Sequence, residues 1–250
     1  MKQLDAHSVD VVVTSPPYNI GINYSTYRDA KSDDEYLDWC EEWGVAIARI
    51  LAPDGSFFLN LGCASENPFF AFSVAMRIGR FFELQNTIHW IKAISIERET
   101  GVTSYGHFKP INSPRFVNDC HEYVFHFTPE GKSKIDRLAV GVPYMDKTNI
   151  QRWSHTNGRD KRCRGNTWFV PYQTIQSREK ERPHPATFPV QLVEWCIKLH
   201  GLTRVKRMLD PFLGIGNAAI AAQRCGVPEF IGFEIDEEYL AEARRRITRG

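Results

Sequence analysis

The chain is predicted to be an α/β protein built on a doubly wound, mostly parallel sheet. Two features of its 250 residues lead to this prediction. First, apolar segments of strand length alternate with segments of helical period along most of the sequence. Second, near the C-terminal end a strand is followed by a glycine turn, a helix and another strand that ends in an acidic residue, which is the order of a βαβ unit.

The first 128 residues carry the longest run of alternating strand and helix patterns. Ser32 and Glu35 have the spacing of a capping box, and a segment of helical period follows them. Pro53-Asp54-Gly55 predicts a turn after that helix. The predicted strands are Val9–Val13, Ser56–Leu61, Gln85–Trp90 and His121–Phe127, and the predicted helices are Asp33–Leu51 and Pro68–Arg80.

Periodicity is weak between Pro129 and Pro183 and returns after that stretch. The stretch is rich in Arg, Lys, Asn and Gly, and it predicts few regular elements. Beyond it, helices are expected near Pro189–Leu199, Asn217–Cys225 and Glu237–Ile247, and strands near Met208–Asp210 and Glu229–Glu234.

The composition is that of a globular protein, with 42% hydrophobic and 24% charged residues. A formal net charge of +1 means that any surface for a polyanion must be local. No apolar run approaches the ~20 residues of a membrane helix, and no secretory signal opens the chain, so a cytoplasmic location without a membrane partner is expected. The six cysteines form no C-x-x-C pair, so neither a metal site nor a disulfide framework is predicted.

The sequence Thr14-Ser15-Pro16-Pro17-Tyr18 follows the first predicted strand. Two consecutive prolines lack N–H donors and cannot continue a sheet ladder, so the chain turns there and leaves carbonyl oxygens free to accept hydrogen bonds. A hydroxyl precedes this corner and an aromatic ring follows it. The arrangement suits a planar group that carries an NH2, because oxygens accept its protons while the ring stacks on its face.

The second candidate site is the turn Asp210-Pro211-Phe212-Leu213-Gly214-Ile215-Gly216-Asn217. Gly214 and Gly216 let the backbone approach a ligand closely, and the helix that follows offers N–H groups and a positive dipole end to a carboxylate. Glu234 ends the next strand, at the spacing of an acid that accepts hydrogen bonds from ribose hydroxyls. The pattern predicts a nucleoside-containing cofactor, and the lack of a third glycine in register disfavours a nicotinamide dinucleotide.

Both segments resemble motifs of the S-adenosylmethionine-dependent amino methyltransferases, which methylate exocyclic nitrogens of nucleic-acid bases. Ser-Pro-Pro-Tyr resembles their catalytic motif and Asp-Pro-Phe-x-Gly-x-Gly their cofactor motif. Their common cofactor motif has Ser between the glycines and Thr-Thr after them, where this chain has Ile215 and Asn217-Ala218. The catalytic motif comes first and the cofactor motif last, which resembles the β group, a circularly permuted form of the class I methyltransferase fold.

The resemblance covers nearly the whole chain apart from residues 129–183. Ile88–Lys92 and His121–Val124 resemble later core strands, and His184-Pro185-Ala186-Thr187-Phe188-Pro189 resembles a motif at the methionine end of the cofactor. Relatives usually have an upstream Gly-Asp pair whose Asp helps to hold adenine. The chain begins too late to contain it, so either a truncated start or a substitute residue is expected.

The resemblance implies one catalytic domain in three parts. Residues 1–128 are the catalytic half, residues 129–183 are a small irregular target-recognition insertion, and residues 184–250 are the cofactor-binding half. The cofactor implied is S-adenosylmethionine, and the residues implied to bind it are Asp210, Phe212, Gly214, Gly216, Asn217, Glu234, Thr187 and Phe188.

The catalytic residues implied are Ser15, Pro16, Pro17 and Tyr18. The Ser15 hydroxyl and the Pro16 carbonyl would accept the amine protons, and Tyr18 would stack on a base that has been extruded from its duplex. In the family, Ser at the first position usually accompanies N4-cytosine targets, and Asp or Asn usually accompanies N6-adenine. Site-specific DNA cytosine-N4 methylation is therefore the leading prediction.

The stretch from Pro129 to Pro183 has twelve Lys or Arg and six Asp or Glu, and it lies where β-group enzymes carry their target-recognition region. Basic side chains neutralise phosphates, and Asn and Arg can read base edges. Trp153 and Trp168 are candidates for stacking on exposed bases, and Trp90, Lys92 and His121 for lining the base pocket or touching phosphate. The residues predicted to bind nucleic acid are Arg152, Trp153, Arg159, Lys161, Arg162 and Arg164.

Several alternatives stay open at this point. One is the same chemistry on ribosomal or other structured RNA, another is N6-adenine methylation of DNA, and a third is a non-catalytic module that binds nucleic acid. Protein-glutamine methyltransferases rank low, because their corner has Asn where this chain has Ser15. The partner predicted is nucleic acid, DNA before RNA; a homodimer and a cognate restriction endonuclease are left open.

Overall fold

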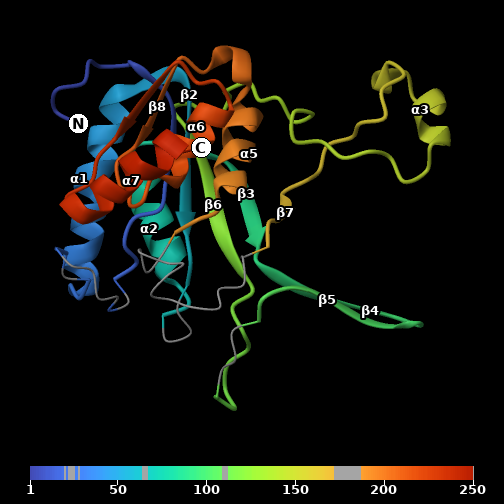
Figure 1. Cartoon of the computed structure of the whole chain (residues 1–250), viewed down its shortest axis with the longest axis horizontal. Helices are drawn as coiled ribbons and strands as arrows, with labels where there is room; N and C mark the ends of the chain where they lie inside the picture. The colour runs from blue at the N-terminus through green and yellow to red at the C-terminus, as the bar shows by residue number, and fades with distance from the viewer. Residues whose placement is uncertain are drawn as a thin grey trace.

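The computed structural model describes residues 1–19, 21, 26–27, 29–63, 67–108, 112–171 and 187–249. Figure 1 shows helices on both sides of a central sheet, with two extensions that leave this body. The strands are β1 (Val9–Thr14), β2 (Leu51–Leu61), β3 (Glu83–Ile91), β4 (Ala93–Arg98), β5 (Gly101–Gly106), β6 (His121–Thr128), β7 (Thr167–Phe169), β8 (Arg207–Asp210) and β9 (Glu229–Gly232). The α-helices are α1 (Asp33–Ile50), α2 (Phe70–Ile78), α3 (Thr148–Arg152), α5 (Val190–His200), α6 (Asn217–Arg224) and α7 (Glu237–Arg249).

The main sheet has seven strands in the order β7-β3-β6-β2-β1-β8-β9. Strand β6 runs antiparallel to its neighbours β2 and β3, and the other pairs are parallel. The predicted mostly parallel α/β sheet is therefore confirmed. Strand β1 lies between β2 and β8 at the middle of the sheet. The strand order runs outward in opposite directions on its two sides. In doubly wound folds, the crevice beyond the carboxyl ends of the strands at such a point is where ligands bind.

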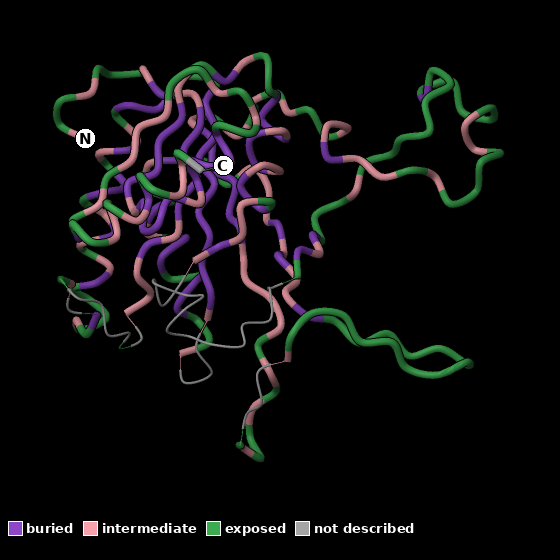
Figure 2. The backbone as a smooth tube through the Cα atoms, in the orientation of Figure 1, coloured by how far each residue is buried: buried purple, intermediate pink, exposed green. Residues whose placement is uncertain are grey.

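The valines of β1 pack into both layers of the core, and a register irregularity between Val9 and Val11 breaks the simple alternation. Val9 and Val12 pack into the cluster under α1 and α2, whereas Val11 and Val13 pack into the cluster under α5 and α6. Both layers are buried, which explains why β1 reads as a continuous apolar run. In Figure 2 the buried residues gather in this body.

Helix α1 begins as its sequence predicts. The Ser32 side chain accepts from the Glu35 backbone N–H, and the Glu35 side chain accepts from the Ser32 backbone N–H, so the capping box is confirmed. The residues on its inner face, from Tyr36 to Ile50, recur at helical spacing and are buried.

Two segments extend from the body on the same side (Figure 1). One is the hairpin of β4 and β5, which pairs only with itself among the described strands. The other is an arm, residues 141–166, which contains α3 and ends at β7 (Figure 1). Most residues of both extensions are exposed (Figure 2).

The structure corrects one prediction in this part of the chain. Pro53-Asp54-Gly55 does not form a separate turn, because β2 runs through it. Val9 pairs with Leu51 and Val11 pairs with Ser56, so the extra residues of β2 bulge out of the ladder instead of ending it. The hairpin and the three-residue strand β7 were not predicted. Among the described residues, no helix is long and apolar enough to cross a bilayer.

Candidate active site

A cavity of about 420 Å³ opens at the carboxyl ends of β1, β8 and β9. The predicted corner lines it with all four of its residues, Ser15 to Tyr18. The glycine turn lines it from the opposite half of the sequence, through Phe212, Gly214 and Asn217. Parallel pairing of β1 with β8, Val12 opposite Leu209, brings these two segments together. They share one cleft although they lie nearly 200 residues apart.

The corner is held by hydrogen bonds from three directions. The Tyr36 hydroxyl of α1 donates to the Pro17 carbonyl. The Ser15 Oγ and Tyr18 Oη atoms lie 2.8 Å apart, so the two ends of the corner are joined. The Tyr18 Oη also lies 3.1 Å from Glu122 Oε2 and 3.3 Å from the Asn60 carbonyl oxygen.

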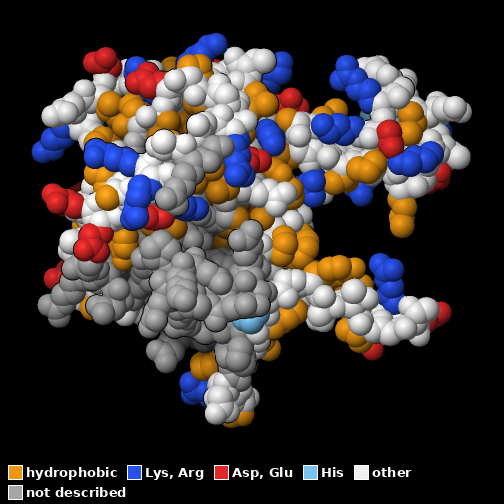
Figure 3. Space-filling view, viewed as in Figure 1, with side chains coloured by type: hydrophobic (Ala, Val, Ile, Leu, Met, Phe, Trp, Pro, Cys, Tyr) orange, Lys and Arg blue, Asp and Glu red, His pale blue; other side chains and the backbone are white. Residues whose placement is uncertain are grey.

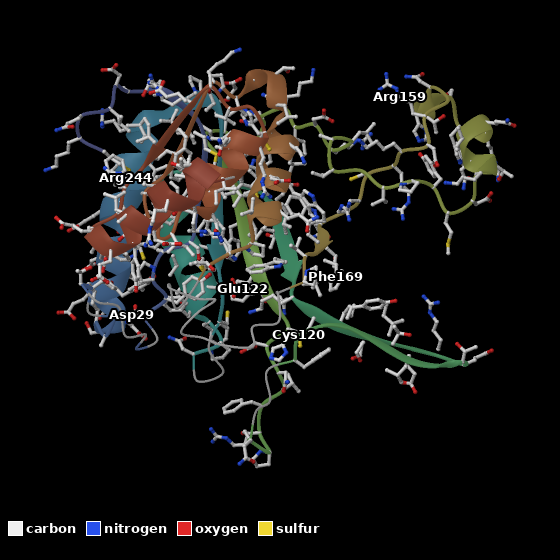
Figure 4. All side chains as sticks on the ribbon, viewed as in Figure 1. Asp29, Cys120, Glu122, Arg159, Phe169 and Arg244 are labelled. Atoms are coloured by element: carbon white, nitrogen blue, oxygen red, sulfur yellow. The ribbon has the colours of Figure 1, made fainter. Side chains whose placement is uncertain are left out.

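Glu122 connects the corner to β2 and to Lys92, the residue that follows β3. Its Oε2 accepts from Asn60 Nδ2 at 3.0 Å, and its Oε1 forms an ion pair with Lys92 Nζ at 2.9 Å. The Glu122 side chain is only 14% exposed. In Figure 4 it lies below the carboxyl ends of the strands, close to where the β4–β5 hairpin leaves the body. A Cβ at Gly62 would lie 3.1 Å from the Tyr18 ring, so glycine there leaves room for that ring.

On the opposite wall of the cavity, the Glu234 carboxylate fixes the glycine turn. Its Oε2 accepts from the Gly214 backbone N–H at 2.7 Å, and its Oε1 accepts from the backbone N–H groups of Ile235 and Asp236 at 2.9 Å. A carboxylate offers about four lone-pair sites, so acceptor capacity remains for a ligand hydroxyl.

Asp210 lies behind the cavity and does not line it. Its side chain is fully buried, and its Oδ1 accepts from the Thr14 hydroxyl at 2.6 Å and from the Phe212 backbone N–H at 3.0 Å. Burial raises the pKa of this carboxyl to about 7, although those two donors oppose the rise. Gly216 also stays out of the cavity lining and adopts a φ of +85°, which favours glycine.

Asn217 takes part in the site at the point where the sequence departs from the common motif. Its Nδ2 donates to the Phe188 carbonyl at 2.6 Å, which ties α6 to residues 187–188 of the cavity wall. That carbonyl fixes the orientation of the amide, so Oδ1 is the remaining acceptor. Within the described part of the chain, this buried Oδ1 has no hydrogen-bond partner. His184, Pro185 and Ala186 of the same predicted motif lie outside the described residues.

Nine further cavity-lining residues had no predicted role: Thr26, Tyr27, Trp39, Asn60, Glu122, Phe233, Ile235, Asp236 and Tyr239. Asn60 is a polar residue inside the apolar run Phe57–Leu61, and this was the signal that could have singled it out, whereas Glu122 near the start of β6 gave no such signal. Trp90 lines the cavity as expected, whereas Lys92 and His121 do not.

The predicted nucleic-acid residues belong to the arm, on which Figure 3 shows several Lys and Arg side chains, and Figure 4 places Arg159 of the arm far from Glu122 of the cavity. Arg152, Arg159, Lys161 and Arg162 are exposed, and Trp153 is 47% exposed. Arg164 turns back to the body, where its Nε donates to the Val140 carbonyl and its guanidinium stacks 4.1 Å from the centre of the Trp195 ring. The proposal that Trp168 stacks on bases is wrong, because its side chain is 1% exposed and packs in the core.

The fold and the cavity define the class of protein. The mostly parallel seven-stranded sheet, whose cavity is lined by both the Ser15–Tyr18 corner and the glycine turn, has the fold of a class I methyltransferase. A family model described as DNA methylase, N6_N4_Mtase, matches residues 9–245, and the chain belongs to this family. The resemblance to β-group amino methyltransferases is thereby confirmed, and S-adenosylmethionine is the cofactor of the family.

Curated relatives match almost the whole chain. Type II methyltransferase M.HpaI of Haemophilus parainfluenzae is 26% identical over 99% of the chain and 70% of its own length. DNA adenine methyltransferase YhdJ of Escherichia coli (strain K12) is 28% identical over 99% of the chain and 79% of its own length. Type II methyltransferase M.ScaI of Streptomyces caespitosus is 30% identical over 99% of the chain and 77% of its own length.

Solved structures share the fold. The PvuII DNA methyltransferase, named as cytosine-N4-specific, superposes with a TM-score of 0.66 at 21% identity, covering 98% of this chain and 81% of its own. M1.HpyAVI in its complex with S-adenosylmethionine superposes with a TM-score of 0.54 at 19% identity, covering 98% of this chain and 90% of its own.

Proposed function

We propose that the protein methylates the exocyclic N4 of cytosine in DNA at a specific sequence. The observation that carries this proposal is the position of Ser15. Its hydroxyl lines the cavity at the carboxyl end of β1, in the same cleft as the glycine turn of the cofactor half. A hydroxyl in place of a carboxylate at this position is the family feature that favours cytosine.

The corner has the groups that an amine of a base requires. The lone pair of such an amine is delocalised into the ring, which makes the nitrogen a poor nucleophile. Hydrogen bonds from both N–H groups to Ser15 Oγ and to the Pro16 carbonyl favour a pyramidal nitrogen whose lone pair points toward the glycine turn. Most of the rate then comes from alignment and charge placement.

The residues of the cofactor half fit S-adenosylmethionine. The Oδ1 of Asn217, which has no partner within the described residues, can accept from the methionine ammonium, and the first turn of α6 can receive the carboxylate. Glu234 has acceptor capacity left for ribose hydroxyls, and Phe233 and Ile235 supply apolar wall for the adenine. When bound, the cofactor supplies a methyl group carried on a positively charged sulfonium.

Recognition of the target sequence is proposed for residues 129–183, of which residues 129–171 are described and include the exposed arm. Its exposed cations lie far from the cavity in Figure 4, where Arg159 marks the arm and Glu122 the pocket. Such separation suits a protein that holds the duplex with the arm while one base enters the cavity. A homodimer and a cognate endonuclease remain proposals of lower rank.

N6-adenine is the second candidate, because the relative YhdJ is named as a DNA adenine methyltransferase. Mass spectrometry of nucleosides distinguishes the two products. DNA free of prior methylation is incubated with the protein and labelled cofactor, beside ribosomal RNA, and each nucleic acid is then digested. The proposal expects label in N4-methylcytosine from DNA. Label in N6-methyladenine or in RNA would overturn the base or the polymer assignment.

A further inference from the structure

We propose that Glu122 is a positioning residue that acts through Tyr18 to keep the Ser15 hydroxyl in the orientation of a hydrogen-bond acceptor. The proposal rests on the assignment of Ser15 in the proposed function, but it concerns the direction of hydrogen bonds and not the identity of the base. A serine hydroxyl at this position can donate a hydrogen bond as well as accept one, whereas the substrate amine presents only donors. Ser15 therefore accepts from the amine only if its own proton is directed elsewhere.

The direction of the chain of hydrogen bonds follows from its far end. Tyr18 Oη lies within hydrogen-bond distance of Glu122 Oε2 and of the Asn60 carbonyl, both of which can only accept. The single hydroxyl proton of Tyr18 is therefore directed to that side.

Because Tyr18 uses its proton there, its oxygen is left to accept from the Ser15 hydroxyl at 2.8 Å. The Ser15 proton then points toward Tyr18, and its lone pairs remain for the amine. A chain in which every hydroxyl points the same way toward a carboxylate is also polarised along its length, which strengthens the acceptor at its start.

The surroundings hold Glu122 in place for this role. Asn60 Nδ2 donates to the same Oε2 that Tyr18 approaches and also to the Tyr123 carbonyl at 3.1 Å, so its amide cannot turn around to compete as an acceptor. Lys92 pairs with Oε1 and holds the other side of the carboxylate. The pair is mostly shielded from solvent, with 20% of the Lys92 side chain and 14% of the Glu122 side chain exposed.

Two substitutions separate this role from a purely structural one. Tyr18→Phe keeps the ring and removes the link, and Glu122→Leu removes the terminal acceptor. Each is expected to lower kcat about 10- to 100-fold, the scale of one hydrogen bond to a charged group, with the S-adenosylmethionine dissociation constant unchanged by calorimetry. Glu122→Gln can still offer an amide oxygen to Tyr18 and Asn60, so it should recover most of the loss.

Coupling between the two positions provides the decisive kinetic measurement. In the Tyr18→Phe background, changing Glu122 to Leu should lower kcat less than twofold further, because the link is already broken. Losses that multiply would overturn the proposal, as would full activity of Tyr18→Phe. Tyr123→Phe is the matched control, since this neighbouring hydroxyl makes no hydrogen bond within the described residues, and it should leave kcat unchanged.

Neutron diffraction from crystals of the deuterated wild-type protein tests the same claim without turnover. The expected map places the Tyr18 deuteron toward Glu122 and the Ser15 deuteron toward Tyr18. A Ser15 deuteron that points into the cavity would refute the orientation whichever base is methylated. Conversely, N6-methyladenine as product would refute the base assignment and leave this inference standing.

Discussion

The hydroxyl of Thr14 donates a hydrogen bond of 2.6 Å to the carboxylate of Asp210, across 196 residues of sequence. Thr14 is the last residue of β1 and directly precedes Ser15, and Asp210 is the last residue of β8 and the first residue of the glycine turn. Because Asp210 Oδ1 also accepts from the Phe212 N–H, one buried oxygen joins the Ser15–Tyr18 corner to the glycine turn.

Thr14→Val should test this joint, because it keeps the shape of the side chain and removes the hydroxyl. A buried acceptor that loses a donor costs about 1–3 kcal/mol, so the free energy of unfolding should fall by that amount in urea titrations. The turnover number should also fall, since the corner loses its tie to the turn. The control is Thr128→Val, which removes a buried, hydrogen-bonded hydroxyl far from the cavity. It should destabilise the protein similarly and leave kcat unchanged. Equal losses of kcat in the two variants would contradict the proposed link between the corner and the glycine turn through Thr14 and Asp210.

The main elements of the fold could be predicted because local sequence and tertiary environment agree there. Strand β1 is apolar and buried on both faces, and α1 has a capping box and a periodic inner face. The β4–β5 hairpin gave no such pattern, since most of its side chains are exposed whichever way they point. Strand β7 has three residues and exists only through its pairing with β3.

The site was predictable where it depends on backbone and on motif, as at Ser15 and Gly214. It was not predictable where it depends on which strands become neighbours. Glu122 reaches Tyr18 because β6 lies next to β2, a pairing that the sequence of either strand does not reveal. Trp168 was assigned to a surface from the charge around it, but its indole fills the core beside Trp195.

Gly216 should be intolerant of a side chain for two separable reasons. Its φ is +85°, and an added Cβ would lie 3.0 Å from the Ala243 Cβ on α7. Gly226 has a φ of +69° but open space around it, so it serves as the control for conformation alone. Gly226→Ala should lower the free energy of unfolding by about 1–2 kcal/mol. Gly216→Ala should lower it further and weaken S-adenosylmethionine binding in calorimetry. Equal effects of the two variants would show that contact with α7 is unimportant.

A buried chain of polar groups should make the stability depend on pH. Asn86 Nδ2 donates to His126 Nδ1, so the proton of the neutral His126 ring is on Nε2. His126 Nε2 donates to Ser56 Oγ. The Ser56 hydroxyl in turn donates to His200 Nδ1. Burial lowers the pKa of His126 to about 3 and that of His200 to about 4. The unfolded chain binds protons at these rings near pH ~6.5.

The contribution of this pair to stability is therefore complete above pH ~6.5 and is lost as the pH falls toward 4, by up to ~1.4 kcal/mol per pH unit for each ring. His126→Asn should flatten the slope of unfolding free energy against pH by about one proton over this range. His155→Asn changes an exposed ring on the arm and should leave the slope unaltered. An unchanged slope in His126→Asn would mean that the lowered pKa of His126 is not the cause of the pH dependence.

Glu234→Ala should weaken cofactor binding by roughly 10- to 100-fold in calorimetry, because it removes both a charged acceptor and the group that holds the Gly214 N–H. Glu229 provides the comparison, since it begins β9, the strand that leads to Glu234, but pairs with Arg207 at the surface. Glu229→Ala should leave the dissociation constant within twofold. If the constant of Glu234→Ala does not move either, the assignment of Glu234 to the ribose is wrong.

Arg159 and Lys161 are exposed on the arm, and neither forms an ion pair with another described residue. If the arm contacts DNA phosphates, each cation releases a counterion on binding, and log K falls with log salt concentration by about 0.9 for each contact. The double variant Arg159→Ala/Lys161→Ala should therefore reduce the magnitude of that slope by about 2 and weaken binding to all duplexes alike. Arg244→Ala removes an exposed cation from α7, on the opposite side of the molecule in Figure 4, and should change neither quantity.

Fluorescence anisotropy between low and moderate salt measures the slope for each variant. A slope that stays at the wild-type value in the double variant would place the phosphate contacts elsewhere, and the hairpin of β4 and β5, which extends from the same side of the body, would be the next element to substitute.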